Sequence, residues 1–426
     1  MSEPEVNLIT KSEIQEALKM RGPVGWLVAS LAMRIMGLNK ANRRYRNCAG
    51  GSTYDFAANV MKEFSIHYDL KENQLDYIPR EGPFLMLANH HFGGIDGMMT
   101  LDILGHIRPD LHTVSTFLLG KVPEIKPNMF SVNPFSQGVG AGQGSLGGMR
   151  QALTHIRNGG CICLFASGEV ATYQRGDNRT SWEKGVIEDI PWPISIVKFV
   201  RMCNCPVLPV YFEGTNSRRF HLLGKIHPML RTINLVNETM NKEGATIPMR
   251  IGKPISVSAM KAYENLEDLY GFLRNRIYAM QAEFESKPRL PRSGFVRATD
   301  LAPEVASRIS TVTFCCDCPR AIQSLIVWFF TEKYRVSEEF AVAEPEKPFV
   351  PYWRNVRPDQ LLSKTDTVEQ FDTLLREISD NAYCLPESVV DLFREGARVI
   401  CFGTDPDAGN SLEGLVLLPH KNTNDE

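Results

Sequence analysis

One stretch of the chain places acid–base side chains directly after an apolar run. Residues 84–88, Phe-Leu-Met-Leu-Ala, are followed by Asn-His-His-Phe-Gly-Gly-Ile-Asp, so that His90, His91 and Asp96 come close together in sequence. In a His–Asp dyad the carboxylate orients the imidazole and stabilises its cation, while the other ring nitrogen takes a proton from a hydroxyl. Such a dyad has no nucleophile of its own. It suits direct transfer of an acyl group to an alcohol.

A structural role is the competing interpretation, because a histidine at the end of a strand is often a turn residue. Two further stretches favour chemistry. The apolar run at 161–165 is followed by Ala-Ser-Gly-Glu, ending at Glu169, and the run at 206–212 is followed by Glu-Gly-Thr-Asn-Ser. If the three runs are neighbouring parallel strands, their polar ends converge on one edge of a sheet, where α/β folds place reactive groups.

The remaining pattern predicts an α/β fold, with a mixed, mostly parallel sheet flanked by helices. We expect strands at 66–70, 75–79, 83–88, 161–165, 206–212 and 249–255, and helices at 54–66, 97–104, 149–158, 194–203 and 266–284. The glycine-rich residues 138–148 lack the Gly-Lys-Ser/Thr of a phosphate-binding loop, so we expect a plain loop there.

Composition shifts predict four regions. Residues 1–50 are helical in character and 51–285 carry the three stretches above, whereas 286–298, with two prolines and four basic residues, indicate a linker. The region 299–426 predicts a small α/β unit of unknown role. It has an apolar aromatic run at 322–330, a helix at 368–378 and strands at 399–402 and 412–418.

The net charge of −2 over 426 residues does not indicate a nucleic-acid partner. The ten cysteines lie mostly in apolar runs, which predicts reduced, buried thiols and a cytoplasmic location. Cys315, Cys316 and Cys318 lack a partner pair for zinc. No apolar run is long enough to span a bilayer. Residues 22–38 contain Trp26 and are followed by basic residues, so they predict either a helix on an anionic membrane surface or a helix docked on the core.

The ordered set of motifs resembles the glycerolipid acyltransferase family. Asn-His…Asp, Phe-x-x-Gly-Glu and Pro-Val-x-Pro-Val occur in the family's order within residues 50–285. The resemblance is closer to the hemolysin-like branch of ornithine-lipid and lysophospholipid O-acyltransferases. It implies a glycerol-3-phosphate acyltransferase-like fold and transfer of a fatty acyl group from acyl-CoA or acyl carrier protein to a lyso-lipid hydroxyl. It also implies no metal or bound cofactor, and peripheral contact with the cytoplasmic face of the membrane.

The resemblance leaves the identity of the base open. The broad family pattern of His, four residues and Asp fits His91, whereas the closer branch, with His directly after Asn, fits His90; Asp96 orients the base in both. It implies oxyanion donors near Gly93 and Gly94. The further residues on the substrate side are Gly168, Glu169, Glu213 and Asn216.

The chain departs from the family at several points. Ala166 stands where the family usually has Pro, Ser167-Gly168 stands where the broad family has Glu-Gly, and the usual Arg is missing near Pro134-Phe135. The missing Arg favours a headgroup other than glycerol phosphate. Arg175 and Arg250 are the alternative sources of positive charge.

Two other functions compete with acyl transfer. The first is a thioesterase or hydrolase with Ser167 or Cys163 as its nucleophile, although Ser167 lacks the Gly-x-Ser-x-Gly elbow. The second is a non-catalytic lipid-binding scaffold, against which the presence of His90, Asp96 and Glu169 argues.

Overall fold

The computed structural model divides the chain into two compact units, residues 1–261 and 262–426. The residues that the structure describes are 7, 10–17, 20, 22–35, 37–116, 119–132, 142–174, 186–226, 228–285, 287, 289–298, 301–353 and 355–419.

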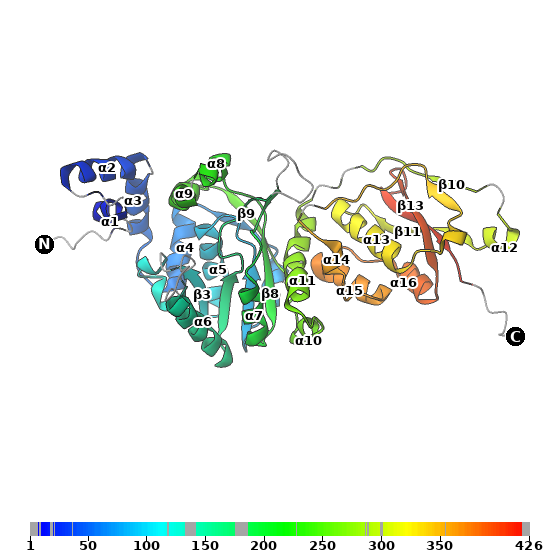
Figure 1. Ribbon diagram of the computed structural model, residues 1–426, viewed down its shortest axis with the longest axis horizontal. Coiled ribbons are helices and arrows are strands. Elements are labelled where there is room, and N and C mark those ends of the chain that lie inside the picture. Colours follow the sequence, from blue (N-terminus) through cyan, green and yellow to red (C-terminus); the bar gives the residue numbers. More distant parts are fainter. Residues whose placement is uncertain are drawn as a thin grey trace. The chain divides into compact units, whose positions relative to one another are not determined.

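A sheet of seven strands forms the centre of the first unit (Figure 1). The strand order is β1 (His67–Asp69), β9 (Thr246–Ile251), β8 (Val207–Phe212), β2 (Phe84–Ala88), β5 (Cys161–Phe165), β3 (Leu111–Thr116) and β4 (Met129–Val132). All neighbouring pairs are parallel except β8 and β9. The expected mixed, mostly parallel sheet is therefore confirmed. The carboxyl ends of β8, β2 and β5 lie at one edge, with Ala88 in register with Val210 and Phe165.

Helices cover the sheet on both sides because the central strands are apolar on both faces. Every residue of β2 is buried, as expected for an interior parallel strand. Phe84, Met86 and Ala88 join a core with residues of α4 (Thr53–Glu63) and α5 (Gly94–Ile107). Elsewhere α6 (Gly142–Arg157) packs on β3, β4 and β5, and α7 (Ile194–Cys203) packs on α6. The short strands β6 (Thr172–Gln174) and β7 (Val186–Glu188) form a separate antiparallel pair.

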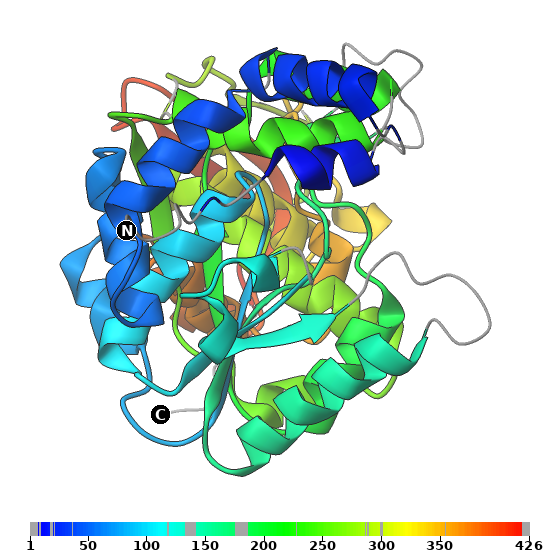
Figure 2. The same cartoon turned by 90° about the vertical axis from the view of Figure 1, so that its left-hand side faces the viewer.

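Of the N-terminal helices, α1 (Lys11–Ala17) packs on α2 (Gly22–Ile35), and α3 (Leu38–Cys48) lies beside α9 (Pro228–Asn241), which packs on α8 (Arg218–Ile226) (Figure 2). The turn between α2 and α3 approaches α9 closely, because a Cβ on Gly37 would come within 2.7 Å of Met240 Cε. Arg44 on α3 pairs with Glu63 at 2.9 Å and also with Glu243. The unit ends with α10 (Val257–Lys261). Within the described part of the chain, no helix is long and apolar enough to cross a bilayer.

Two predictions for the first unit are wrong. Residues 75–79 do not form a strand, because Glu72–Tyr77 is a 3₁₀ helix in which the side chain of Gln74 accepts a hydrogen bond from Ile251 N at 2.9 Å. The glycine-rich run is not all loop, because α6 begins at Gly142; residues 138–141 lie outside the described residues. A Cβ on Gly148 would come within 2.0 Å of Ser131 O, so close packing of α6 on β4 requires glycine there.

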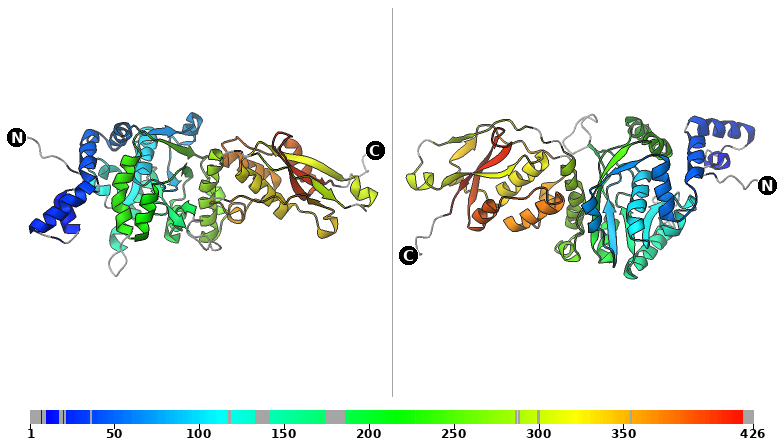
Figure 3. Two further views of the ribbon diagram at one scale, coloured as in Figure 1. Left: turned by 90° about the horizontal axis from the view of Figure 1, so that it is seen from above. Right: turned by 180° about the vertical axis from the view of Figure 1, so that it is seen from behind.

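The second unit contains an antiparallel sheet with helices beside it (Figure 3). The sheet order is β11 (Ile309–Cys316), β14 (Ser411–Leu417) and β13 (Arg398–Asp405), and β10 (Phe295–Arg297) pairs separately with β12 (Ala343–Pro345). The predicted helix at 266–284 is α-helical only over α11 (Leu266–Tyr278) and continues as a 3₁₀ helix, Ala279–Phe284. The other helices are α12 (Pro303–Ala306), α13 (Arg320–Lys333), α14 (Pro358–Leu361), α15 (Val368–Ile378) and α16 (Glu387–Arg394).

Aromatic rings fill the core of this second unit. Phe329 on α13 stacks on Phe371 of α15 with ring centroids 4.1 Å apart. Phe330 contacts Phe314 on β11 and Phe393 on α16. The predicted helix at 368–378 matches α15, and the predicted strands at 399–402 and 412–418 match β13 and β14, so all three are confirmed.

Candidate active site

Asn89 joins the ends of two central strands. Its buried carboxamide donates from Nδ2 to Phe212 O at 2.9 Å and accepts at Oδ1 from Phe212 N at 2.8 Å. This pair of hydrogen bonds continues the β2–β8 pairing by one residue beyond β2. The residue that follows, His90, is thereby held at the edge where the strands end.

His90 and Asp96 form the dyad that the sequence predicts. His90 Nδ1 lies 3.0 Å from Asp96 Oδ2, and the same oxygen accepts hydrogen bonds from Phe92 N at 2.8 Å and Gly93 N at 3.1 Å. Asp96 is fully buried in the first turn of α5, where the helix dipole favours a negative charge. Its Oδ1 has no hydrogen-bond partner among the described residues. The carboxylate therefore holds both the imidazole and the turn that carries it.

Contacts of both its ring and its backbone hold His90 in place. It stacks on Phe165 with ring centroids 4.3 Å apart, its backbone N–H donates to Asp189 Oδ1 at 3.0 Å, and its carbonyl accepts from Ala171 N at 2.7 Å. The side chain is 17% exposed, so it is accessible from outside. Since Nδ1 faces the carboxylate, Nε2 is the nitrogen that can meet a substrate hydroxyl.

His91 has a different environment. Its side chain is 2% exposed and lies edge-on to the Tyr211 ring, with centroids 6.1 Å apart. Burial lowers the pKa of His91, although the nearby Asp189 carboxylate acts in the opposite direction. The structure thus brings His90 to Asp96, and it places His91 in the core of the turn.

Asp189 is a residue of the site that the sequence did not reveal. It is buried, lies between β7 and α7, and accepts hydrogen bonds from His90 N and from Trp192 Nε1 at 3.2 Å. Burial raises the pKa of its carboxyl group. The segment Asp-Ile-Pro-Trp at 189–192 carries no motif that would connect it to a histidine 99 residues earlier.

Gly93 and Gly94 have distinct roles in the turn. Gly93 has a φ of +86°, and a Cβ there would come within 2.8 Å of Leu235 Cδ2 on α9, so only glycine fits. Its N–H already donates to Asp96 Oδ2 at 3.1 Å. The N–H of Gly94, at the start of α5, makes no hydrogen bond within the described residues, so it is available to a ligand.

The loop after β5 brings Gly168 and Glu169 to the same edge. Gly168 has a φ of +69°, and Glu169 is exposed. Ser167 is buried and its Oγ donates to Glu169 O at 2.7 Å, whereas burial raises the pKa of the Cys163 thiol to about 12. Neither is prepared as a nucleophile, which argues against the hydrolase alternative.

The loop after β8 carries Glu213 and Asn216. Glu213 is half-buried and accepts a hydrogen bond from Tyr211 Oη at 2.8 Å. Asn216 is buried, and neither atom of its carboxamide has a partner in the described part of the protein. The loop is packed against the dyad turn, because a Cβ on Gly214 would come within 2.7 Å of Phe92 Cζ.

Helix α9 supports this loop with charged residues that the sequence did not reveal. The buried carboxylate of Glu238 accepts from Ser217 N at 2.8 Å and from Ser217 Oγ at 2.6 Å. Lys242, just after α9, donates to Thr215 O at 2.8 Å. These contacts fasten the β8 loop over the turn that carries the dyad.

Of the two alternative sources of positive charge, Arg250 contacts the backbone of β1 and β9. Arg250 on β9 donates to Asp69 O at 2.7 Å and to Met249 O at 2.8 Å, and β8 separates its strand from β2. Arg175, Pro134 and Phe135 lie outside the described residues.

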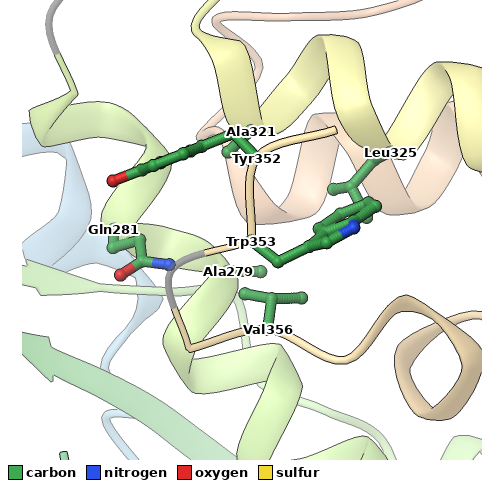
Figure 4. Close-up of a pocket in the computed structure, with 7 residues that line it drawn as sticks. All are labelled: Ala279, Gln281, Ala321, Leu325, Tyr352, Trp353 and Val356. Carbon is green, nitrogen blue, oxygen red and sulfur yellow. The ribbon is translucent and has the colours of Figure 1, made fainter. Parts of the chain in front are cut away.

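A crevice in the second unit offers no comparable chemistry. It contains about 250 Å³ of space, part of it open to solvent, and its wall is mainly apolar (Figure 4). The lining residues are Ala279, Gln281, Ala321, Leu325, Tyr352, Trp353 and Val356. None of them is a histidine, cysteine or carboxylate, so the dyad edge of the first unit is the candidate active site.

The region that contains this site is similar in sequence to known proteins. A family model described as acyltransferase matches residues 34–287. The lyso-glycine lipid O-acyltransferase of Phocaeicola vulgatus is 23% identical over 260 residues, 59% of this chain and 87% of the relative. The protein of the same name from Bacteroides thetaiotaomicron is 22% identical over 188 residues, 42% of this chain and 64% of the relative. The solved 1-acyl-sn-glycerophosphate acyltransferase PlsC from Thermotoga maritima gives a TM-score of 0.32 at 15% identity, covering 52% of this chain and 76% of that chain.

Proposed function

The chain belongs to the acyltransferase family, and from this premise we propose that it transfers a fatty acyl group to the hydroxyl of a lyso-lipid by general-base catalysis. The observation that carries the proposal is the contact of 3.0 Å between His90 Nδ1 and the buried Asp96 carboxylate, which leaves Nε2 for a substrate. Two relatives named lyso-glycine lipid O-acyltransferase support a lyso-aminolipid acceptor, with lysophospholipids as the alternative class.

In the proposed reaction, His90 Nε2 removes the proton from the acceptor hydroxyl as its oxygen attacks the carbonyl carbon of an acyl thioester. Asp96 stabilises the imidazolium that forms. The carbon–sulfur bond then breaks, and the leaving thiolate takes the proton from His90. The products are an ester and a free thiol. The N–H of Gly94 is the proposed donor to the oxyanion, because those of Phe92 and Gly93 are held by Asp96.

The loops on either side of the dyad carry the residues that we propose to contact the substrate. Gly168 and Glu169 border the dyad from the β5 side, and Glu213 and Asn216 border it from the β8 side. An acceptor whose hydroxyl reaches His90 would lie between these two loops. The acyl donor is proposed to be acyl-CoA or acyl carrier protein.

A matrix of donors and acceptors tests this function. Labelled acyl-CoA and acyl carrier protein loaded with the same labelled acyl group would each be offered with lyso-glycine lipid, another lyso-aminolipid and lysophospholipids. The products would be identified by mass spectrometry. We expect acyl ester formed in proportion to the thiol released. Release of free fatty acid without acceptor, together with a trapped covalent acyl-enzyme, would support the hydrolase instead.

We also propose that α2 contacts the cytoplasmic face of a membrane. Val24, Leu27 and Leu31 follow one face of this helix and are 57–65% exposed, and Trp26 is 52% exposed. The basic residues that follow complement an anionic surface. They are Arg34, Lys40, Arg43 and Arg46.

Vesicle sedimentation tests the membrane contact. Binding to vesicles that contain anionic lipid should fall at least fivefold in Leu27→Glu. It should not change in Val350→Glu, where an equally exposed apolar residue of the second unit gains the same charge. Equal binding by all three proteins would contradict the role of α2.

A further inference from the structure

Lys242 places an ammonium group next to the dyad turn. Its Nζ donates to Thr215 O at 2.8 Å and lies 4.7 Å from the centroid of the Phe92 ring. Phe92 is the residue whose N–H binds Asp96, and Thr215 belongs to the loop that follows β8. The ammonium therefore joins the two segments that border His90.

Among the described residues, the charge of Lys242 has no counter-ion close by. The side chain is half-buried, and no carboxylate of the described residues lies within 4.0 Å of it. Burial lowers the pKa of Lys242, and Glu238 and Asp96 act in the opposite direction from farther away. Both of these carboxylates already accept hydrogen bonds from other groups. The Thr215 carbonyl uses one of the three N–H donors, and the Phe92 ring face attracts the cation, but neither group neutralises its charge.

A position near the end of α9 does not by itself explain this arrangement. A cation at the C-terminus of a helix is favoured by the helix dipole and often binds the last carbonyls of that helix. Lys242 Nζ instead donates to Thr215, which lies in another segment. The side chain thus reaches toward the candidate site.

Asn216 provides an independent indication of a ligand. It follows Thr215 directly, is 3% exposed, and both atoms of its carboxamide lack a partner within the part of the protein described. Buried polar groups of folded proteins are normally hydrogen-bonded, so an unpaired carboxamide in the residue after Thr215, whose carbonyl Lys242 contacts, indicates a bound acceptor group.

We propose that Lys242, together with Asn216 of the loop after β8, binds the anionic group of the acceptor lyso-lipid, a carboxylate or a phosphate. This inference rests on the proposed function. The acceptor is the favoured source of the anion because its hydroxyl must reach His90, so its headgroup lies near the dyad. The phosphates of a CoA or carrier-protein donor are separated from the thioester by the whole pantetheine arm.

Kinetics with charged and uncharged acceptors test the proposal. Lys242→Met should lower kcat/KM for acceptors with a carboxylate or phosphate headgroup at least tenfold, the range expected for a hydrogen bond between charged groups. The change should appear in the KM of the acceptor. For an uncharged monoacylglycerol the change should be less than threefold, and Lys242→Arg should restore at least half of the lost activity. Lys62→Met, at an exposed position on α4, is the matched control.

The arms of this experiment separate the two sources of the anion. A rise in the KM of the donor, with the KM of the acceptor unchanged, would overturn the proposal and assign Lys242 to the donor phosphates. Equal losses with charged and uncharged acceptors would also overturn it, because they would show a structural role for the Lys242–Thr215 contact.

A binding measurement makes the inference testable without turnover. Calorimetry with dodecyl phosphate and N-dodecanoylglycine, below their micellar concentrations, should show binding to the wild type at least tenfold tighter than to Lys242→Met. Their uncharged counterpart, dodecanoylglycerol, should bind the wild type and Lys242→Met with equal affinity. If the wild type transfers no acyl group but keeps this Lys242-dependent preference, the proposed function fails and the anion site stands. If the preference is missing, the anion site is wrong.

Discussion

Replacing Asp96 by Asn removes the charge of the dyad while keeping its shape. Asp96 Oδ2 accepts hydrogen bonds from Phe92 N and Gly93 N as well as from His90 Nδ1. The carboxamide oxygen of Asn can accept from both backbone groups, so we expect the turn to persist. The variant then tests how much the negative charge contributes to catalysis.

The size of the effect follows from the distance between the two groups. At 3.0 Å and an effective dielectric constant of about 20, the attraction between an imidazolium and a carboxylate is about 5.5 kcal/mol. Each 1.4 kcal/mol changes a rate about tenfold, so loss of this attraction can lower kcat by at most about four orders of magnitude. Because the His90 ring is partly exposed and general-base catalysis typically contributes about 10²–10⁴-fold, we expect kcat to fall in that range.

The assay is acyl transfer under saturating donor and acceptor, with circular dichroism to verify folding. The KM of the acceptor should change little. Asp102→Asn serves as a control on the same helix, where it alters the contact with Tyr68 and should leave kcat within about threefold. A folded Asp96→Asn protein with kcat within threefold of the wild type would refute the dyad.

Three further predictions concern stability. Gly93→Ala should lower the free energy of unfolding by about 1–3 kcal/mol, because φ is +86° and Leu235 occupies the space of a Cβ; denaturant titration measures this. Asn89→Ala should lower it by about 2–4 kcal/mol, because two buried backbone groups of Phe212 lose their partners. The pKa of His91 is lowered by burial, so below about pH 6.5 the unfolded chain binds more protons than the folded one. Stability should therefore decrease as the pH falls through 6.5, by at most about 1.4 kcal/mol per pH unit, and His91→Gln should reduce this slope.

The sequence predicts the local parts of the site well, because each of them is encoded within a few residues. The apolar run before Asn89 predicts β2, and the spacing of His90 and Asp96 predicts their contact across a glycine turn. The same spacing fits His91 as well. The choice between the two histidines depends on which side of the turn faces the core, and this is set by Tyr211 on a strand more than a hundred residues later.

Other features of the site depend on tertiary contacts that leave no local pattern. Asp189 and Lys242 come to the dyad turn from segments about 100 and 150 residues away in sequence, and neither lies in a recognisable motif. Leu75-Asp76-Tyr77 alternates like a strand, but it belongs to the 3₁₀ helix Glu72–Tyr77, in which Gln74 pairs with the backbone of β9. Glycines predicted to form a loop belong to α6, and one of them, Gly148, lets this helix pack closely on Ser131.

The most direct test of the central claim compares His90→Gln with His91→Gln in transfer of a labelled acyl group from a thioester to lyso-lipid. The proposed mechanism predicts that His90→Gln loses at least 10²-fold in kcat, whereas folded His91→Gln protein keeps activity within about tenfold of the wild type. Retention of activity by His90→Gln, or an equal loss in both folded variants, would contradict the assignment of His90 as the general base.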